Sequence, residues 1–223
     1  SVQHLDVTFA IDRAGIVGAD GPTHQGAFDL SYLRCVPGMV IFAPSDEAEC
    51  RDMLYSAFLH EGPAAVRYPR GSGPGTIESA VMRRIPIGKA QIRREGQGVA
   101  LLAFGTMLGA ALEAAETLNA TVVNMRSVKP LDTNLILDMA KAHELLVTIE
   151  ENTVLGGAGA GVSQVLSEAG YETPTMALGL PDQHVDQGDP GAVLAHYGLD
   201  AAGICAAVLR RRPLQSVASR SSA

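Results

Sequence analysis

The chain has 223 residues, of which 47% are hydrophobic and 18% are charged, which is typical of a folded protein with one large or two smaller domains. Its formal net charge of −7 argues against non-specific binding to nucleic acid or to an anionic membrane surface. Cys35, Cys50 and Cys205 are too scattered for a disulfide framework, which favours a reducing cytoplasm, and we predict no membrane-spanning run and no signal peptide.

The first predicted strand, residues 7–11, leads into a long connection rich in glycine and titratable groups. Residues 12–26, called the site loop below, hold four glycines, a proline, an arginine, two carboxylates and a histidine, and a helix is predicted after them at 28–34. Glycine and proline suit tight turns, and α/β sheets bind ligands at the carboxyl ends of their strands. The pattern therefore favours a functional site over a solvated surface loop.

Two more strands and a helix are predicted before residue 70. Residues 39–43 and 64–68 are short apolar segments typical of buried strands. Between them, Ser45 is expected to cap a helix whose buried face consists of Cys50, Met53, Leu54, Ala57 and Phe58. A stretch rich in glycine, serine, proline and threonine follows, so we predict a first domain over residues 1–70 and a linker over residues 71–84.

Strands and helices alternate over residues 85–212, the second predicted domain. Strands are expected at residues 87–92, 99–104, 121–124, 145–150 and 175–178, and helices at residues 107–119, 132–142, 162–169, 190–197 and 200–211. This alternation is typical of βαβ units with a mainly parallel sheet, so the predicted fold class is α/β with two domains. The small polar residues 213–223 predict a disordered tail.

Two features near residue 150 are interpreted as structural. The glycine cluster at 156–161 follows a strand, but its spacing does not fit the G-x-G-x-x-G dinucleotide motif, so a tight strand-to-helix turn is preferred. Glu150 and Glu151 end a strand, where adjacent side chains point to opposite sides. They are therefore a poor acid–base pair, and we expect them to be solvated or interface carboxylates.

Arg13, Asp20, His24 and Arg70 are the candidate site residues. Arg13 and Arg70 each follow a predicted strand, so in a parallel sheet they can project over the same edge. Arginine matches phosphate with two parallel hydrogen bonds, which indicates a phosphorylated or carboxylated substrate; ion pairs with nearby aspartates are the alternative. If Asp20 and His24 meet, the carboxylate would orient the imidazole for proton transfer.

Several segments closely resemble the 1-deoxy-D-xylulose-5-phosphate synthase family, a branch of the transketolase-like superfamily. In the first domain they are Asp12-Arg13-Ala14-Gly15, residues 18–26 and Arg67-Tyr68-Pro69-Arg70-Gly71. In the second they are Val128-Lys129-Pro130-Leu131-Asp132, Glu150-Glu151-Asn152 with the glycine cluster, and Gly198-Leu199-Asp200. The likeness runs from about residue 7 to about residue 210. It implies part of a thiamin-diphosphate-binding (pyrimidine) domain followed by a transketolase C-terminal domain.

The resemblance implies an enzyme that uses thiamin diphosphate and Mg²⁺ to condense pyruvate with glyceraldehyde 3-phosphate, releasing carbon dioxide, for isoprenoid, thiamin and pyridoxal biosynthesis. It also implies a cytoplasmic homodimer whose cofactor and metal are held mainly by an N-terminal remainder outside these 223 residues; no cofactor or metal ligand is assigned within the chain. By position, Asp20 and His24 match the family's active-site aspartate and histidine. Arg13 and Arg70 match the arginines that hold the acceptor's phosphate.

Three alternatives stay open. The β subunit of a 2-oxo acid dehydrogenase shares the two-domain arrangement, and transketolase itself takes a ketose phosphate instead of pyruvate as donor. From a different class, the chain is an inactive structural or dimerising fragment. Because a truncated sheet exposes apolar edge surface, we expect these residues to be stable only with the rest of the enzyme, a nicked partner or a dimer mate.

Overall fold

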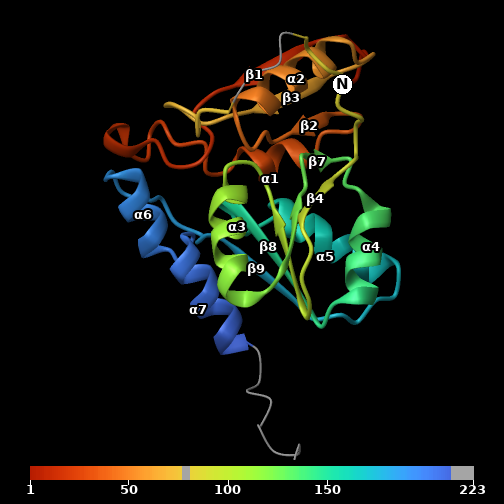
Figure 1. Cartoon of the computed structure of the whole chain (residues 1–223). Helices are drawn as coiled ribbons and strands as arrows, with labels where there is room; N and C mark the ends of the chain where they lie inside the picture. The colour runs from red at the N-terminus through yellow and green to blue at the C-terminus, as the bar shows by residue number, and fades with distance from the viewer. Residues whose placement is uncertain (77–80, 212–223) are drawn as a thin grey trace, which may run out of the picture.

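Two β-sheets organise the computed structural model, which describes residues 1–76 and 81–211 (Figure 1). The first sheet has the strand order β1 (Thr8–Ile11), β3 (Ala64–Arg67), β2 (Val40–Phe42) and β7 (Ser127–Lys129). The second has the order β4 (Gln91–Arg94), β6 (Thr121–Asn124), β5 (Val99–Ala103), β8 (Leu145–Thr153) and β9 (Thr175–Leu180). The predicted tail and residues 77–80 of the predicted linker lie outside the described residues.

Most neighbouring strands run parallel. β1, β3 and β2 are parallel, as are β6, β5, β8 and β9, while β7 and β4 pair antiparallel with β2 and β6. The central strands β5 and β8 are buried along their whole length, as expected of aliphatic strands covered on both faces. The α/β class with a mainly parallel sheet is confirmed, although β4 begins four residues later than predicted and β8 ends three residues later.

Seven α-helices and one short 3-10 helix lie between or after the strands of the described residues: η1 (Gly18–Asp20), α1 (Asp29–Arg34), α2 (Glu47–Phe58), α3 (Met107–Leu118), α4 (Thr133–Ala142), α5 (Ala158–Glu168), α6 (Pro190–His196) and α7 (Ala201–Arg211). On one face of the second sheet, α3 and α7 bury side chains such as Ala111 and Ile204. On the other face, α4 and α5 bury Ile136 and Val162. Figure 1 shows α3 and α5 on either side of β8.

One strand of the first sheet comes from the second half of the chain. Residues 1–70 are called the first sequence region below, and residues 85–212 the second. β7 lies beyond the linker, yet it pairs with β2, with Ile41 opposite Lys129 and Phe42 opposite Ser127. The Lys129 ammonium also donates to the carbonyl of Arg34, the last residue of α1, at 2.8 Å. The sequence does not predict β7, because three residues carry too little alternation to form a pattern.

Three local features differ from the sequence predictions. The cap of α2 is Asp46, whose carboxylate accepts from the Glu49 N–H at 2.8 Å, and Ser45 instead donates its hydroxyl to the Glu49 carboxylate. Phe58 ends α2 with 77% of its surface exposed, so it does not belong to the buried face. α5 begins at Ala158, inside the glycine cluster and four residues earlier than predicted.

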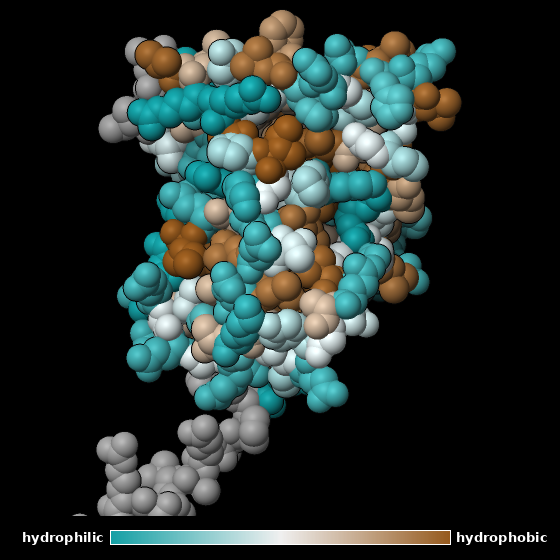
Figure 2. Space-filling view, turned by 90° about the vertical axis from the view of Figure 1, so that its right-hand side faces the viewer, coloured by the Kyte–Doolittle hydropathy of each residue, from teal (hydrophilic) through white to brown (hydrophobic). Residues whose placement is uncertain are grey.

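Apolar side chains also reach the surface. Figure 2 shows one face on which hydrophobic residues gather in patches between hydrophilic ones. In and before β1, Leu5 is 53% exposed, Val7 40% and Phe9 46%. Among the described residues, β1 pairs with β3 alone and is therefore an outer strand. This is the kind of apolar sheet edge that further polypeptide would cover.

One stretch, Pro190–Arg211, is long and apolar enough by length and composition to cross a membrane, contrary to the sequence prediction. In the structure it forms two helices, α6 and α7, which are separated at residues 197–200. Ile204 and Val208 of α7 are fully buried in the cluster that includes α3. The break and the buried stripe are those of amphipathic helices on a folded domain.

Candidate functional site

The site loop and the segment after β3 lie side by side at the carboxyl edge of the first sheet. β1 and β3 are parallel neighbours, so the chain leaves both strands on the same side. Just beyond the strands, the Ala14 N–H donates to the carbonyl of Tyr68 at 3.0 Å. Arg13 and Arg70 closely flank this hydrogen bond in sequence. The two arginines therefore lie on adjacent loops at one sheet edge, as their positions predict.

Both arginines are paired with aspartates. A guanidinium nitrogen of Arg13 donates to the Asp12 carboxylate, and one of Arg70 donates to the Asp20 carboxylate. The side chains of Arg13 and Arg70 are 37% and 54% exposed, so both charges remain accessible to a ligand. The ion pairs foreseen as the alternative interpretation are present, and a bound phosphate would have to share or replace an aspartate at each arginine.

His24 lies exposed near the tip of the site loop and contacts Thr23, not Asp20. Its ring Nδ1 is 2.9 Å from Thr23 Oγ1, and its backbone N–H donates to the Gly21 carbonyl at 3.1 Å. Among the hydrogen bonds of the described residues, the Asp20 carboxylate is taken by Arg70. A guanidinium is the stronger partner for a carboxylate than a neutral imidazole, so the contact on which the orienting role of Asp20 depends is not formed.

Glycines close the base of the site loop and bring its tip to the second sequence region. Gly15 N–H donates to the Gly26 carbonyl at 3.0 Å, and Gly26 N–H donates to the Arg13 carbonyl at 2.8 Å. At the tip, the Gly18 carbonyl accepts from Gly188 N–H at 3.3 Å, in the segment between β9 and α6. Both Gly15 and Gly18 have φ near +70°, where side chains with a Cβ are disfavoured.

A buried ion pair lies beneath the site loop. Arg67 Nε donates to both carboxylate oxygens of Asp29 at 3.1 Å, and each side chain is 4% exposed. Arg67 Nη2 donates to the carbonyls of Gly26, at 2.5 Å, and Glu151, at 2.8 Å. One guanidinium thus joins the end of the site loop, the start of α1 and the end of β8. Its only sequence signal is a cationic residue at the end of a buried strand.

Glu151 links β8 directly to the site loop. Its Oε1 accepts from the Ile16 N–H at 2.6 Å and its Oε2 accepts from the Thr106 hydroxyl at 2.9 Å. Only 6% of Glu151 is exposed. Burial raises the pKa of its carboxyl, against the opposing effects of the Ile16 hydrogen bond and the Arg67 charge. Glu151 is therefore an interface carboxylate, one of the two expected possibilities, and not a solvated one.

Glu150 points the other way, as adjacent residues on a strand do. Its carboxylate accepts from the N–H groups of Ala158 and Gly159, at 2.7 and 2.8 Å, where α5 begins. Glu150 is fully buried, and burial raises the pKa of its carboxyl to about 7, although both backbone hydrogen bonds act in the opposite direction. The expectation of a solvated or interface carboxylate is wrong for Glu150, because its carboxylate serves the free N–H groups at the buried start of α5.

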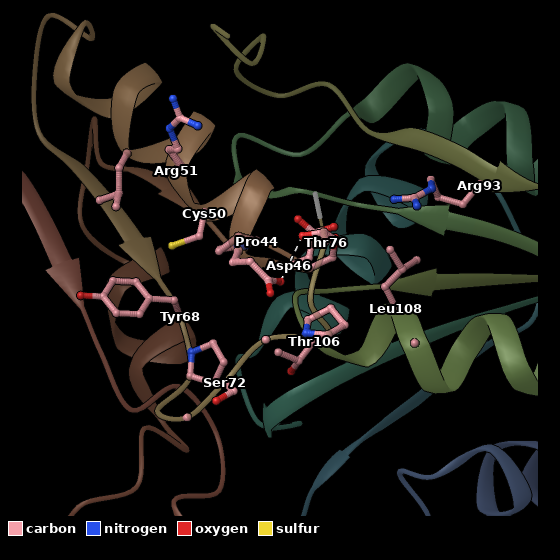
Figure 3. A pocket seen from close by; sticks show the side chains of 18 of the residues that line it. Pro44, Asp46, Cys50, Arg51, Tyr68, Ser72, Thr76, Arg93, Thr106 and Leu108 are labelled. Carbon is pink, nitrogen blue, oxygen red and sulfur yellow. Dashed lines mark hydrogen bonds between the residues drawn. The ribbon is translucent and has the colours of Figure 1, made fainter. Parts of the chain in front are cut away.

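A cavity of about 780 Å³ lies beside the candidate site (Figure 3). Figure 3 shows Tyr68 on the side nearer α2 and Thr106 opposite it, just before α3. Pro69 and Gly71, the neighbours of Arg70, also line the cavity. The cavity therefore shares a wall with the loop that carries Arg70. It is not predictable from sequence patterns, because its walls come from segments far apart in the chain.

Among the described residues, no group of three or more His, Cys, Asp or Glu side chains is placed to hold a metal ion. The cations of Arg13 and Arg70 suit the phosphate of a substrate. The donor set therefore fits a phosphate-bearing substrate, and within the described residues it does not fit Mg²⁺, which prefers carboxylate and other oxygen ligands.

Two family models match the chain. One, described as transketolase, pyrimidine binding domain, covers residues 1–76, and the other, described as transketolase, C-terminal domain, covers residues 88–204. Curated relatives named 1-deoxy-D-xylulose-5-phosphate synthase are similar over almost the whole chain. The one from Methylobacillus flagellatus is 60% identical over 95% of this chain and 34% of its own length. The one from Nitrosospira multiformis is 60% identical over 96% of this chain and 35% of its own length.

Solved structures give the same fold. A structure titled split gene transketolase, inactive beta4 tetramer, has a TM-score of 0.84 and 36% identity, and the match covers 94% of this chain and 68% of that chain. The transketolase from Campylobacter jejuni has a TM-score of 0.68 with 20% identity, over 91% of this chain and 31% of that chain. The chain spans about a third of the length of the curated relatives that it matches.

Proposed function

The chain belongs to the transketolase family, and we propose that it is part of an enzyme that condenses pyruvate with glyceraldehyde 3-phosphate to 1-deoxy-D-xylulose 5-phosphate and carbon dioxide. Relatives that are about 60% identical and bear the name of this synthase support the proposal. The structural observation that carries it is the placement of Arg13 and Arg70 on adjacent loops, with His24 on the same site loop. Below, the complete enzyme means this chain together with the polypeptide that supplies the remaining two thirds, in the same chain or as a separate subunit.

Arg13 and Arg70 hold the acceptor through its phosphate. Each guanidinium is partly exposed and already faces a carboxylate, so each is charged and positioned before the substrate arrives. The phosphate takes the place of Asp20 on Arg70, or adds to it through the remaining guanidinium N–H groups. Fixing the acceptor at this end lowers the entropic cost of bringing two substrates together.

His24 acts on the oxygen that gains negative charge when the new carbon–carbon bond forms. Because Thr23 Oγ1 occupies Nδ1 at 2.9 Å, Nε2 is the ring nitrogen left for the substrate, and it carries the ring proton in the tautomer in which the Thr23 hydroxyl donates to Nδ1. A hydrogen bond from Nε2 to the former aldehyde oxygen stabilises that charge and can deliver the proton. Asp20 acts through Arg70, which it holds, and not through the imidazole.

Thiamin diphosphate, when bound, supplies the electron sink for the loss of carbon dioxide from pyruvate. We place its metal, Mg²⁺, and most of its contacts in the polypeptide beyond this chain, since the described residues offer no metal cluster. We further propose that the complete enzyme is a homodimer that works in the cytoplasm on these small-molecule substrates. The free Cys35, Cys50 and Cys205 suit a reducing compartment.

A second candidate is one subunit of a two-chain transketolase. The similarity to a split-gene transketolase, at 36% identity and over 68% of that chain, favours it. On this reading the chain alone is inactive and a second subunit completes the site. The higher identity to the synthase relatives favours pyruvate over a ketose phosphate as the donor.

Product analysis of the complete enzyme distinguishes these functions. With pyruvate and glyceraldehyde 3-phosphate, we expect one carbon dioxide to be released for each 1-deoxy-D-xylulose 5-phosphate formed. Carbon-13 NMR of reactions with labelled pyruvate measures both products. Product formed from a ketose phosphate donor without carbon dioxide would identify a transketolase. A complete enzyme that is folded and inactive with both donors would support a structural role and overturn the proposal.

A further inference from the structure

We propose that Glu151 is a positioning residue that fixes the site loop, and through it Arg13, for the phosphate of the acceptor. The inference rests on the proposed function for its substrate. Its structural part, the attachment of the loop to β8 by one buried carboxylate, stands on the geometry alone. Glu151 comes from the second sequence region and the loop from the first, so the site depends on how the two regions are joined.

The hydrogen bonds of Glu151 lie close to Arg13 along the chain. Ile16, whose N–H binds Glu151 Oε1 at 2.6 Å, is three residues beyond Arg13. Gly15 makes room for this contact, since a Cβ at that position would lie 2.1 Å from Glu151 Cδ. Gly15 also has φ of +71°, which favours glycine on its own. The carboxylate therefore holds the first turn of the loop in place through the Ile16 N–H.

The second oxygen of the carboxylate is fixed from the opposite side. Thr106, which directly precedes α3 and lines the cavity, donates its hydroxyl to Glu151 Oε2 at 2.9 Å. Figure 3 shows Thr106 on the wall across from Tyr68, whose carbonyl accepts from Ala14 of the same loop. Because both oxygens accept hydrogen bonds, the orientation of the carboxylate is fixed. The hydrogen bond to the Ile16 N–H in turn fixes the position of the loop backbone.

Burying the charge of the Glu151 carboxylate costs free energy unless hydrogen bonds and a cation compensate for the lost water. Among the hydrogen bonds of the described residues, its carboxylate has one backbone donor and one hydroxyl donor, while Arg67 donates to the backbone carbonyl of the residue instead. Burial raises the pKa of the Glu151 carboxyl, which is the expected sign for a buried carboxylate without a direct cation partner. A buried carboxylate of this kind adds little to stability, and what it provides here is a hydrogen bond to each of two segments, at Ile16 and at Thr106.

Glu150 provides a matched control. It is the preceding residue on β8, it is equally buried, and its carboxylate also accepts two hydrogen bonds. Those bonds go to the start of α5 and not to the site loop. Loss of either carboxylate therefore removes a buried acid from the same strand end, but only loss of Glu151 should change the loop.

The structural part is tested by hydrogen exchange in the complete enzyme, read by mass spectrometry on peptides that cover residues 12–26. We expect Glu151→Ala to speed exchange in this segment by about tenfold or more, since an accepted backbone hydrogen bond is lost. Glu151→Gln should restore most of the protection, because its amide can accept from Ile16 and donate to Thr106. Unchanged exchange in Glu151→Ala, or equal exchange in Glu150→Ala, would overturn the proposal.

The functional part is tested by steady-state kinetics of the same variants. We expect Glu151→Ala to raise KM for glyceraldehyde 3-phosphate by about tenfold and to leave KM for pyruvate within about twofold, because a small displacement of Arg13 weakens the hold on phosphate. Glu151→Gln should recover most of the loss, and Thr106→Val should show a smaller rise. An equal rise for both substrates, or the same rise in Glu150→Ala, would contradict a positioning role.

The two tests separate the possible failures. If the wild-type complete enzyme does not use glyceraldehyde 3-phosphate, the proposed function fails, and the exchange data still decide whether Glu151 fixes the loop. If the enzyme is active and exchange in residues 12–26 does not respond to Glu151→Ala, the positioning role fails and the proposed function stands.

Discussion

Two buried glutamates join the first sequence region to the second, and they do so in opposite ways. The carboxylate of Glu49 on α2 accepts from Asn124 at 2.9 Å, Arg126 at 2.7 Å and the Ser45 hydroxyl at 2.7 Å. We call this group of four residues the helix seam. The carboxylate of Glu151 on β8 accepts from Ile16 and Thr106, and Arg67 donates to the backbone carbonyl of Glu151. We call this second group of four residues the loop seam. The first carboxylate binds a guanidinium directly and the second does not.

The difference appears in the pKa of each carboxyl. Burial acts to raise the pKa of Glu49, but hydrogen bonds from Asn124, Ser45 and Arg126 outweigh it and hold the pKa below its usual value. For Glu151, burial prevails and the pKa is raised. In the helix seam, hydrogen bonds therefore compensate for the burial of the Glu49 charge. In the loop seam, the burial of the Glu151 charge beside the candidate site is not fully compensated. Perturbed pKa values of this kind cluster at functional sites.

The largest effect is expected from Arg67→Met, which removes the cation of the loop seam. It leaves the Asp29 carboxylate buried without its partner, so we expect a loss of about 3–5 kcal/mol in the free energy of unfolding, measured by urea denaturation. The double variant Arg67→Met/Asp29→Asn should lose less, since it buries no unpaired charge. A loss below about 1 kcal/mol in the single variant would show that the pair contributes little.

The pH dependence of stability should reveal Glu150, the neighbour of Glu151 outside the loop seam. Its folded pKa of about 7 lies above the reference value of 4.5, so the folded state binds the proton more tightly. The resulting stabilisation is fully present below pH 4.5 and is lost as the pH rises to about 7, a change of about 3 kcal/mol. Glu150→Gln should flatten this slope in urea denaturation at pH 5 and pH 8, and an unchanged slope would exclude Glu150 as its source.

The helix seam should behave in the opposite sense. Arg126→Met removes one charged donor from Glu49, and we expect a loss of about 1–3 kcal/mol at neutral pH. Because the folded pKa of Glu49 is depressed, the wild-type stabilisation is present above the reference value and is lost as the pH falls through the folded pKa. The variant should lose less on acidification. Equal acid sensitivity in both proteins would contradict the role of Arg126.

The smallest effect on stability is expected at the exposed edge of the site. Arg70→Ala breaks the pair with Asp20, but these side chains are 54% and 31% exposed and screened by water. We expect less than about 1 kcal/mol of destabilisation by urea denaturation. A much larger loss would mean that Arg70 serves the fold, and would weaken its assignment to substrate.

The sequence was sufficient for the elements that carry a repeating pattern. Alternation predicts the parallel second sheet, and the positions of Arg13 and Arg70 after two strands predict their common edge. It was insufficient where contacts depend on partners distant in the chain. Nothing local to Glu151 indicates Ile16 as its partner, 135 residues away. Similarly, the pairing of Asp20 with Arg70 instead of His24 is decided by tertiary proximity, which spacing within the loop does not reveal.

The central claim, that the loops after β1 and β3 bind a phosphate, is tested most directly by acceptor specificity in Arg70→Ala. The measurement is kcat/KM of the complete enzyme for glyceraldehyde 3-phosphate and for glyceraldehyde without phosphate, at saturating pyruvate. We expect the wild-type preference for the phosphorylated aldehyde to fall by about tenfold to a hundredfold, with KM for pyruvate nearly unchanged. A preference that survives the substitution, or an equal loss for both aldehydes and for pyruvate, would contradict the claim.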